Sequence, residues 1–199
     1  MEAHSALAEN GLNAIYLATE MISGIGTFQQ QIKQNHEQDT GFTVPYSTLH
    51  VGTIHGGTAL NIVPGLCEFK FEIRNLKSDD PNKILEKIKD IAKSIEQKYI
   101  RDFPSVSIEI EIFNEYPALN TSTEEEVVRY IQALVQGDSP IKLDFGTEGG
   151  LFQNRLGVPT VVCGPGSMDQ GHKPDEFIEQ IELQRCDQFL SRLLDHISI

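Results

Sequence analysis

The loop at residues 164–176, GPGSMDQGHKPDE, carries His172 among glycine, proline and acidic residues. An apolar segment, residues 158–163, precedes this loop, and an amphipathic helical pattern follows it to the C-terminus. Loops at the carboxyl ends of buried strands are where α/β folds bind ligands, and glycine lets the backbone approach a ligand closely. An imidazole in such a loop can bind a metal ion or transfer a proton, although a surface histidine is the plain alternative.

Other polar residues in turns and at strand ends also have two interpretations. His4 lies near the N-terminus, where an exposed histidine is the default, and Asn61 can stabilise a turn by an Asx hydrogen bond. Arg74 ends a strand with a charged outer face, where a surface salt bridge is the ordinary expectation. Glu148 precedes Gly149 in a glycine-flanked loop, where a solvated carboxylate is the ordinary expectation.

No cluster of His, Asp and Glu stands at metal-ligand spacing in this sequence. His172 therefore either stands alone or has partners on a segment outside the sequence. There is also no Walker loop, no dinucleotide fingerprint and no Gly-x-Ser-x-Gly nucleophile elbow. The sequence by itself offers no complete catalytic motif.

The first part of the chain predicts two helices and three strands. Apolar residues recur at helical spacing in residues 13–32, and Asp79, Asp80 and Pro81 predict the start of a second helix. Apolar and polar residues alternate, as in strands, at residues 47–55, 67–74 and 106–112. In the first of these strands the alternation predicts one face made of Leu49, Val51, Thr53 and His55.

The order α-β-β-α-β becomes a ferredoxin-like split unit when one strand is added before Met1. The alternation fits an antiparallel sheet that is covered on one face by the two helices. We therefore expect an α+β domain at residues 1–115.

Residues from Tyr116 onward predict a different layer. A helix is expected from a capping sequence at residues 121–124 to about Gln136. The elements expected after it are a strand at 141–145, a loop at 146–150, a short helix at 151–154, a strand at 158–163 and the C-terminal helix. This run is typical of an α/β layer but is too small for a complete doubly wound sheet. We expect residues 116–199 to be the C-terminal portion of a larger α/β domain.

The chain of 199 residues is acidic, with a formal net charge of −13 and a pI of about 4.8. This charge argues against nucleic acid or an anionic membrane surface as a partner, because both select basic patches. No apolar run approaches the length of a membrane span, and the N-terminus does not have the pattern of a signal peptide. Cys67, Cys163 and Cys186 are expected to be buried free thiols in a reducing cytoplasm.

Five stretches of the chain, in this order, resemble metallopeptidase family 20. They are residues 3–5 together with 11–15, then 54–64, 71–74, 146–149 and 164–176. The family includes acetylornithine deacetylase, succinyl-diaminopimelate desuccinylase, aminoacylase-1 and glutamate carboxypeptidases. The stretches HGGTALNIVP and CGPGSMDQGHKPDE most resemble acetylornithine deacetylases. The combination is specific, whereas each stretch alone is not.

The resemblance implies a two-domain cytoplasmic enzyme whose lid, residues 1–115, forms a homodimer. His172 matches the family's last metal ligand, and His4 matches the lid histidine that polarises the scissile carbonyl in the partner's active site. Asn61 and Arg74 match lid residues that contact the carboxylate end of the substrate or support that loop. Glu148 and Gly149 lie in the loop that faces the substrate's side chain, where a carboxylate suits the ornithine ammonium by charge pairing.

The activity implied is hydrolysis of an N-acyl amino acid, namely N-acetylornithine in arginine biosynthesis, with two zinc ions, or cobalt as the alternative, as cofactor. Members of the family carry a His-x-Asp pair, a bridging Asp and a Glu-Glu pair before the lid, and this chain has none of them. Metal-activated hydrolysis needs those groups, so we expect the chain alone to be inactive.

Two alternatives remain open at this point. The chain can be a non-catalytic ferredoxin-like dimerisation or ligand-sensing module, or part of a related desuccinylase, aminoacylase or peptidase. The DNA upstream of the Met1 codon separates the module from the enzyme, because only the enzyme requires the missing ligand segment.

Overall fold

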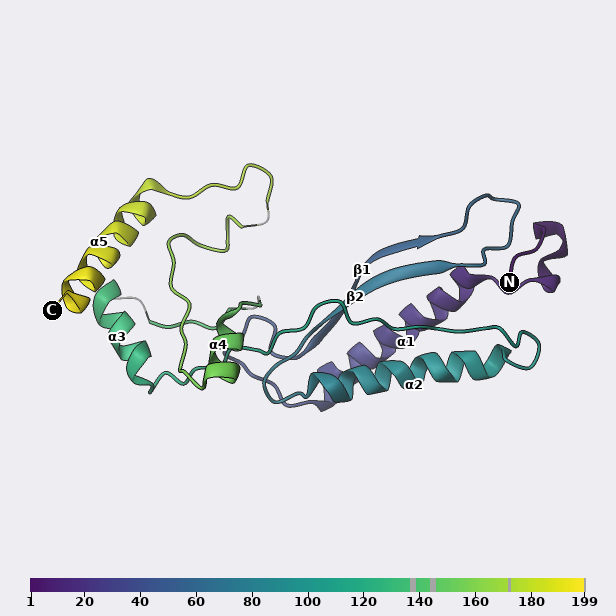
Figure 1. Cartoon of the computed structure of the whole chain (residues 1–199), viewed down its shortest axis with the longest axis horizontal. Coiled ribbons are helices and arrows are strands. Elements are labelled where there is room, and N and C mark those ends of the chain that lie inside the picture. Colours follow the sequence, from purple (N-terminus) through teal and green to yellow (C-terminus); the bar gives the residue numbers. More distant parts are fainter. Residues whose placement is uncertain (137–138, 144–145, 172, 199) are drawn as a thin grey trace. The chain divides into compact units, whose positions relative to one another are not determined.

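The computed structural model describes residues 1–136, 139–143, 146–171 and 173–198 (Figure 1). The chain divides into two compact units, Met1–Glu115 and Tyr116–Ile199. None of the described helices is both long and apolar enough to cross a membrane.

The first unit is a β-hairpin packed on two helices. Its elements are the 3-10 helix η1 (Ser5–Asn10), helix α1 (Ala14–Asn35), strands β1 (Thr48–Gly56) and β2 (Cys67–Arg74), and helix α2 (Pro81–Tyr99). The two helices lie side by side along the hairpin (Figure 1). The second unit contains α3 (Glu126–Val135), α4 (Gly149–Leu156) and α5 (Gln180–Ile197).

Helix α1 begins where the Asn13 side chain accepts hydrogen bonds from the amides of Ile15 and Tyr16, at 2.9 and 3.4 Å. It continues three residues beyond the predicted end at residue 32, because Ile32 is fully buried and holds the last turn against the core. Gly24, in the middle of the helix, is explained by close packing. A Cβ atom at this position would lie 2.6 Å from Cγ2 of Ile91 on α2.

Helix α2 begins as predicted, with Asp80 accepting from the amide of Asn82 at 2.9 Å and Pro81 in the first turn. Its apolar stripe meets that of α1 in one core. Fully burying a Leu, Ile, Met or Phe side chain in this core stabilises the fold by about 1.5–3 kcal/mol. The buried members of this core are Leu12, Leu17, Met21, Ile25, Phe28, Ile32, Ile84, Ile88, Ala92 and Ile95.

The hairpin matches the two predicted strands, but one face assignment was wrong. β1 and β2 pair antiparallel from Thr48 opposite Arg74 to Gly56 opposite Cys67, with a bulge between Val51 and Thr53. Val51 lies opposite Phe71, and Ile54 lies opposite Phe69, so Ile54 shares the inner face. The extra residue of a bulge reverses the alternation, which moves Thr53 and His55 to the outer face.

The strand predicted at residues 106–112 does not form. Val106, Ile108 and Ile110 pack against the core, and the residues between them are exposed, as the alternation requires. No ladder joins this segment to β2 in the described part of the chain. In a ferredoxin-like split unit, the strand before α2 and the strand after α2 lie on either side of a third strand. Residues 106–112 therefore have no adjacent strand with which to pair.

The second unit also departs from the predicted strands. Of the strand expected at 141–145, Asp144 and Phe145 lie outside the described residues, and residues 141–143 and 158–163 form no ladder. Alternating or apolar segments become strands only when an adjacent backbone supplies hydrogen bonds.

The prediction that the three cysteines are buried was wrong, although all three are free thiols. Cys163 is exposed, and Cys67 and Cys186 are half-buried.

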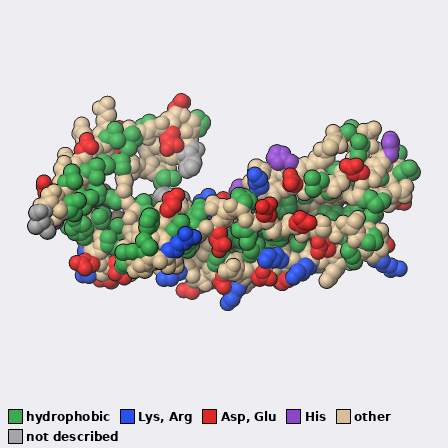
Figure 2. Space-filling model, viewed as in Figure 1, with side chains coloured by type: hydrophobic (Ala, Val, Ile, Leu, Met, Phe, Trp, Pro, Cys, Tyr) green, Lys and Arg blue, Asp and Glu red, His purple; other side chains and the backbone are tan. Residues whose placement is uncertain are grey.

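Helix α3 begins at Glu126, later than its capping sequence predicts. The Ser122 hydroxyl accepts from the amide of Glu124 at 3.2 Å, and the Ser122 carbonyl accepts from Glu125 at 3.1 Å, which forms a turn before the helix. The capping sequence therefore forms this turn and no side-chain cap of α3. Hydrophobic side chains gather on the surface of this unit (Figure 2), and α5 buries none of its residues.

A buried polar network joins the ends of α1, β1 and α2. The Ser47 side chain, which is fully buried, donates to Asp79 Oδ2 at 2.5 Å and accepts from the amide of Leu76 at 2.8 Å. His36 Nδ1 lies 2.7 Å from the other oxygen of the Asp79 carboxylate. Ser47 and the Asp79 carboxylate are largely removed from water, so each depends on its partners, whereas His36 is partly exposed.

A second polar contact joins the helices nearer the other end of α2. Lys98 and Tyr99 donate to the two carboxylate oxygens of Glu20, Lys98 at 2.6 Å. Both hydrogen bonds lower the pKa of Glu20, and the one from Lys98 has the larger effect. The bond to Glu20 in turn raises the pKa of Tyr99. The pair holds α1 and α2 in register at the surface.

We predict that Ser47→Ala lowers the free energy of unfolding by about 1–3 kcal/mol, because the Leu76 amide and Asp79 Oδ2 lose the Ser47 hydroxyl as their buried partner. Urea unfolding followed by circular dichroism measures the change. Ser23→Ala on the exposed face of α1 is the control and should change stability by less than about 0.5 kcal/mol. Equal effects of the two substitutions would show that the network contributes nothing specific.

Candidate functional site

His4 caps the first turn of η1 in a way that fixes its tautomer. Its Nδ1 accepts from the amide of Ala6 at 3.1 Å, and its backbone pairs antiparallel with Ile62. Because Nδ1 is an acceptor, a neutral ring carries its proton on Nε2. The side chain is exposed. It therefore presents an N–H donor to solvent, which is the group needed to bind a carbonyl oxygen.

Asn61 lies beside His4. Its carbonyl accepts from the amide of Ser5 at 3.0 Å, and the residue is exposed. In the described part of the chain no hydrogen bond involves its side-chain amide, so the Asx turn considered for it is not formed. The turn is closed instead by the amide of Ile62, which donates to the carbonyl of Ala59 at 3.2 Å. The Asn61 amide can thus contact a ligand together with His4.

Arg74 lies at the opposite end of the hairpin. Its Nε and Nη2 donate to the two carboxylate oxygens of Glu72, at 3.0 and 3.3 Å. This is the surface ion pair that its strand position indicates. β2 spans about 23 Å at about 3.3 Å per residue. One copy of the first unit therefore brings His4 and Asn61 together and places Arg74 elsewhere.

In the second unit Glu148 directly precedes α4. Its carboxylate is exposed and makes no capping bond, while its carbonyl accepts from the amide of Leu151 at 2.9 Å. Gly149 is buried, and its amide donates to the Thr147 hydroxyl at 3.3 Å. The carboxylate is therefore presented to solvent from a buried backbone.

Two residues that the sequence analysis did not single out position this loop. Thr147 supplies the hydroxyl described above, and Gln153 bonds both the amide and the carbonyl of Asn120, at 3.0 and 3.2 Å. Gly150 packs so closely on residue 117 that a Cβ atom would lie 1.9 Å from the Pro117 carbonyl oxygen. The adjacent glycines in the sequence were the available signal for this close approach.

His172 lies outside the described residues, so its role as a metal ligand stays a prediction. Beside it, the amide of Gly171 donates to the carbonyl of Met168 at 3.1 Å, and Lys173 Nζ donates to the carbonyl of Asp169. Among the described residues no three His, Cys, Asp or Glu side chains come together as metal ligands. The part of the chain that the structure describes does not form a metal centre.

Cys163 directly precedes the same loop. Although the residue as a whole is exposed, desolvation of the thiol raises its pKa, and nearby Cys186 raises it further. A raised pKa keeps the thiol protonated at neutral pH, so it is a poor nucleophile there.

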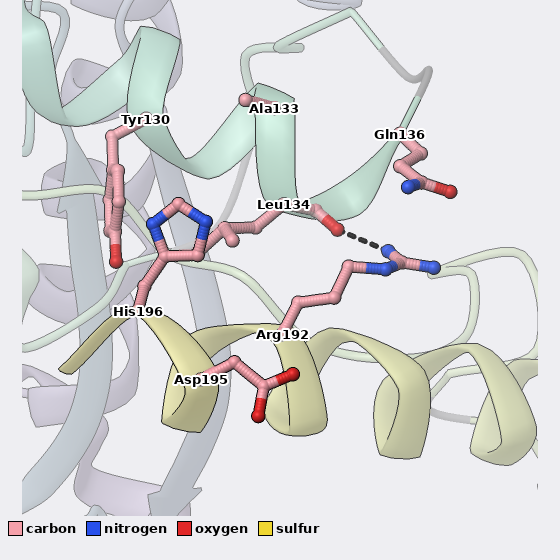
Figure 3. A pocket seen from close by; sticks show the side chains of 7 residues that line it. All are labelled: Tyr130, Ala133, Leu134, Gln136, Arg192, Asp195 and His196. Atoms are coloured by element: carbon pink, nitrogen blue, oxygen red, sulfur yellow. Dashed lines mark hydrogen bonds between the residues drawn. The ribbon is translucent and has the colours of Figure 1, made fainter. Parts of the chain in front are cut away.

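An open pocket lies between α3 and α5 (Figure 3). The Tyr130 and His196 rings meet edge to face with centroids 5.9 Å apart, and Arg192 donates to the Leu134 carbonyl at the end of α3. These contacts join the two helices and satisfy the carbonyl. The pocket contains none of the candidate residues.

The first unit matches a known domain family. Residues 2–100 match the family described as the peptidase dimerisation domain. Solved structures with the same fold include an M20 family metallo-carboxypeptidase from Sulfolobus solfataricus, at a TM-score of 0.68 and 19% identity, covering 97% of this chain and 54% of that one. An aminopeptidase from Bacillus cereus gives 0.69 at 19% identity, covering 100% and 49%. The first unit therefore belongs to the M20 peptidase dimerisation domain family and is an α+β lid, and the chain has the fold of M20 metallopeptidases.

The similar proteins include acetylornithine deacetylases. The one from Myxococcus xanthus is 32% identical over 98% of this chain and 50% of its own length. The one from Photorhabdus laumondii is 30% identical over 98% of this chain and 49% of its own length. The chain thus spans about half the length of these relatives.

We predict that Gly150→Ala disrupts the loop before α4, because its new methyl group meets the Pro117 carbonyl. Hydrogen exchange should show faster exchange of the amides in α4, by about tenfold or more, which corresponds to local destabilisation above about 1.4 kcal/mol. Gly164→Ala is the matched control, since a Cβ atom there has no neighbour within 4 Å. Unchanged exchange in Gly150→Ala would contradict the packing described.

Proposed function

We propose that the chain is part of a metal-dependent amidohydrolase that removes the acetyl group of N-acetylornithine. Water adds to the acyl carbon, the C–N bond breaks, and acetate and ornithine leave. The similarity to acetylornithine deacetylases over 98% of the chain supports this substrate. The observation that carries the chemistry is the Nε2 donor of His4, exposed beside Asn61.

His4 would stabilise the oxyanion that forms when water attacks the acyl carbon. A donor held by the fold costs little reorganisation when charge develops on the oxygen, and loss of one such donor costs about 10²–10³ in rate. The Ala6 amide holds the ring in the tautomer that this role requires. In the dimer His4 would serve the partner's active site.

The substrate would be oriented by the other candidate residues. The side-chain amide of Asn61 would bind the substrate's carboxylate end next to His4. Arg74, far from His4 within one copy, would support the lid loop or reach that carboxylate from another copy. Glu148 would pair with the ornithine ammonium, and Gly149 would let the backbone lie close to it.

His172 would hold one of two metal ions, zinc or alternatively cobalt, that polarise the carbonyl and acidify the water when bound. The described residues supply no group of three ligands, so the remaining donors would come from polypeptide outside this chain. No step above is therefore assigned to the metal. The same shortage of donors favours the second candidate, a dimerisation or ligand-sensing module without catalysis.

The lid would form a homodimer through β1 and α1. The outer edge of β1 has no ladder partner in the described part of the chain, and α1 packs under this strand. The exposed face of α1 carries the small residues Thr19, Ser23, Gly26 and Thr27. A two-fold pairing of β1 edges would extend the sheet across both copies and bring these faces together.

We predict that the 199-residue chain does not hydrolyse N-acetylornithine in the presence of zinc or cobalt, whereas the same chain extended at its N-terminus by the ligand-bearing half does. Release of ornithine measures the reaction. Turnover by the short chain would contradict the proposed need for outside donors. Inactivity of a folded, metal-loaded extended protein on N-acetylornithine and on other N-acyl amino acids would favour the module.

In the extended protein we predict that His4→Asn lowers kcat by about 10²–10³ with little change in KM, because the Nε2 donor is lost. The Asn carbonyl can still accept from the Ala6 amide, so the turn should persist in circular dichroism spectra. Ser94→Asn, at an exposed position of α2, is the control. Equal rates for the His4 variant and the unchanged protein would remove His4 from the mechanism.

We predict that Ser23→Arg weakens dimerisation by at least about tenfold, since it puts a long charged side chain on the face of α1 that would meet the second copy. Sedimentation equilibrium measures the dissociation constant. Ser94→Arg makes the same change on the exposed face of α2 and should leave it unaltered. If both variants dimerise like the unchanged chain, α1 is not at the interface.

A further inference from the structure

The side chain of Gln29 on α1 bonds the outer edge of β1 where the strand begins. Its Nε2 donates to the carbonyl of Ser47 at 3.2 Å, and its Oε1 accepts from the amide of Leu49. In an antiparallel strand the backbone groups of successive residues point alternately to the two sides. Leu49 and Val51 therefore turn their backbone groups away from β2, and the Leu49 amide already has a partner.

The bulge changes which residues of β1 turn outward. Even-numbered residues of β2 bond to β1 along the hairpin, and before the bulge they stand opposite even-numbered residues of β1. Beyond the bulge they stand opposite Thr53 and His55. The outward backbone groups in this half of β1 therefore belong to Ile54 and Gly56.

In the lid homodimer proposed above, these orientations select one register for the two β1 strands. Val51 pairs with Ile54 of the second copy, because both turn their backbone groups outward and both have side chains on the inner face. The two-fold axis repeats this pair, so the ladder runs from His50 to His55, which is most of the strand. At each end Gln29 keeps the Leu49 amide and ends the ladder.

Other two-fold registers conflict with the structure. Pairing Val51 with Val51 of the second copy would place the inner residue Leu49 beside the outer residue Thr53. Pairing Leu49 with Val51 would need the amide that Gln29 holds. Pairing Ile54 with its own copy would use only residues 52–56, because β1 ends at residue 56.

The selected register brings histidines of the two copies together. His50 lies directly opposite His55 of the second copy, and both residues are exposed on the outer face. Side chains that are directly opposite across antiparallel strands have Cβ atoms about 4.5–5.5 Å apart. On β2, Glu68 stands opposite His55. Each half of the dimer interface therefore carries a row of His50 from one copy with His55 and Glu68 from the other.

We propose that each row binds one divalent transition-metal ion of the zinc class, so that a dimer holds two. Imidazole nitrogens bind zinc at about 2.0–2.1 Å, and two nitrogens sharing an ion are within reach of neighbouring cross-strand side chains. Glu68 supplies a carboxylate oxygen as the third ligand, and water completes the coordination. This site rests on the proposed homodimer but not on the proposed hydrolysis.

One copy alone does not form this site. His50 and His55 lie on the same strand, roughly 15 Å apart at about 3.3 Å per residue. Among the described residues of one copy, no three His, Cys, Asp or Glu side chains come together as metal ligands. Because the ion binds the dimer and not the monomer, it must strengthen dimerisation by mass action.

Sedimentation equilibrium of the 199-residue chain with excess Zn²⁺ or with a chelator tests this linkage. We expect zinc to lower the dimer dissociation constant at least about tenfold. His50→Asn and His55→Asn should each abolish this zinc effect while leaving the dissociation constant in chelator nearly unchanged. Thr53→Asn changes an exposed residue of the same face that is not a ligand, so the zinc effect should persist.

Cysteine cross-linking tests the register without metal. The double variant His50→Cys with His55→Cys should form a disulfide-linked dimer on oxidation with oxidised glutathione, seen by non-reducing electrophoresis. Neither single variant should cross-link more than the unchanged chain, because residue 50 lies opposite residue 55 and not opposite itself.

The outcomes separate this site from the dimer and from the activity. A dimer that zinc leaves unaltered, or that zinc tightens equally in the histidine variants, overturns the metal site. Cross-linking of a single variant overturns the register. A chain that stays monomeric with and without zinc overturns both the site and the proposed homodimer, whereas hydrolysis of N-acetylornithine enters none of these measurements.

Discussion

The contact between α1 and α2 is the constraint on which the first unit depends. Met21, Ile25 and Ile88 are almost completely removed from water at this contact, and Gly24 lets the Ile91 side chain approach the backbone of α1. The hairpin has only two strands, which are marginal by themselves in water. Its stability therefore derives from the helices beneath it, and every residue of the hairpin and its loops is positioned by the same core.

This dependence explains how the chemistry-bearing residues are distributed. His4 and Asn61 belong to a loop region that is tied back to the beginning of α1 and the end of the hairpin, so their spacing is set by backbone hydrogen bonds. Glu148 belongs to a separate unit with a small buried core and is positioned by Thr147, Gln153 and the close packing of Gly150. The two sets of residues have independent local supports.

The sequence predicted the elements that depend on local pattern and capping. β2 has the predicted bounds, because alternating burial is complete over its length, and α2 begins at its predicted aspartate cap. The face of Thr53 and His55 was wrong because a bulge leaves no clear signal in residue type. In residues 106–112 apolar and polar residues alternate perfectly, but no backbone ladder forms. Strand pairing needs two segments, whereas the alternation describes only one of them. For the same reason the sequence could name candidate residues one by one, and their roles stay predictions, whereas the separation of Arg74 from His4 required the register of the hairpin.

The hydroxyl groups on the exposed face of α1 are turned back to the helix itself. Thr19 donates to the carbonyl of Ile15 at 2.8 Å, and Thr27 donates to the carbonyl of Ser23 at 3.0 Å. With their hydrogens used in this way, both hydroxyls can only accept further hydrogen bonds. Covering this face would therefore leave neither hydroxyl hydrogen without an acceptor, which lowers the cost of removing these two groups from water.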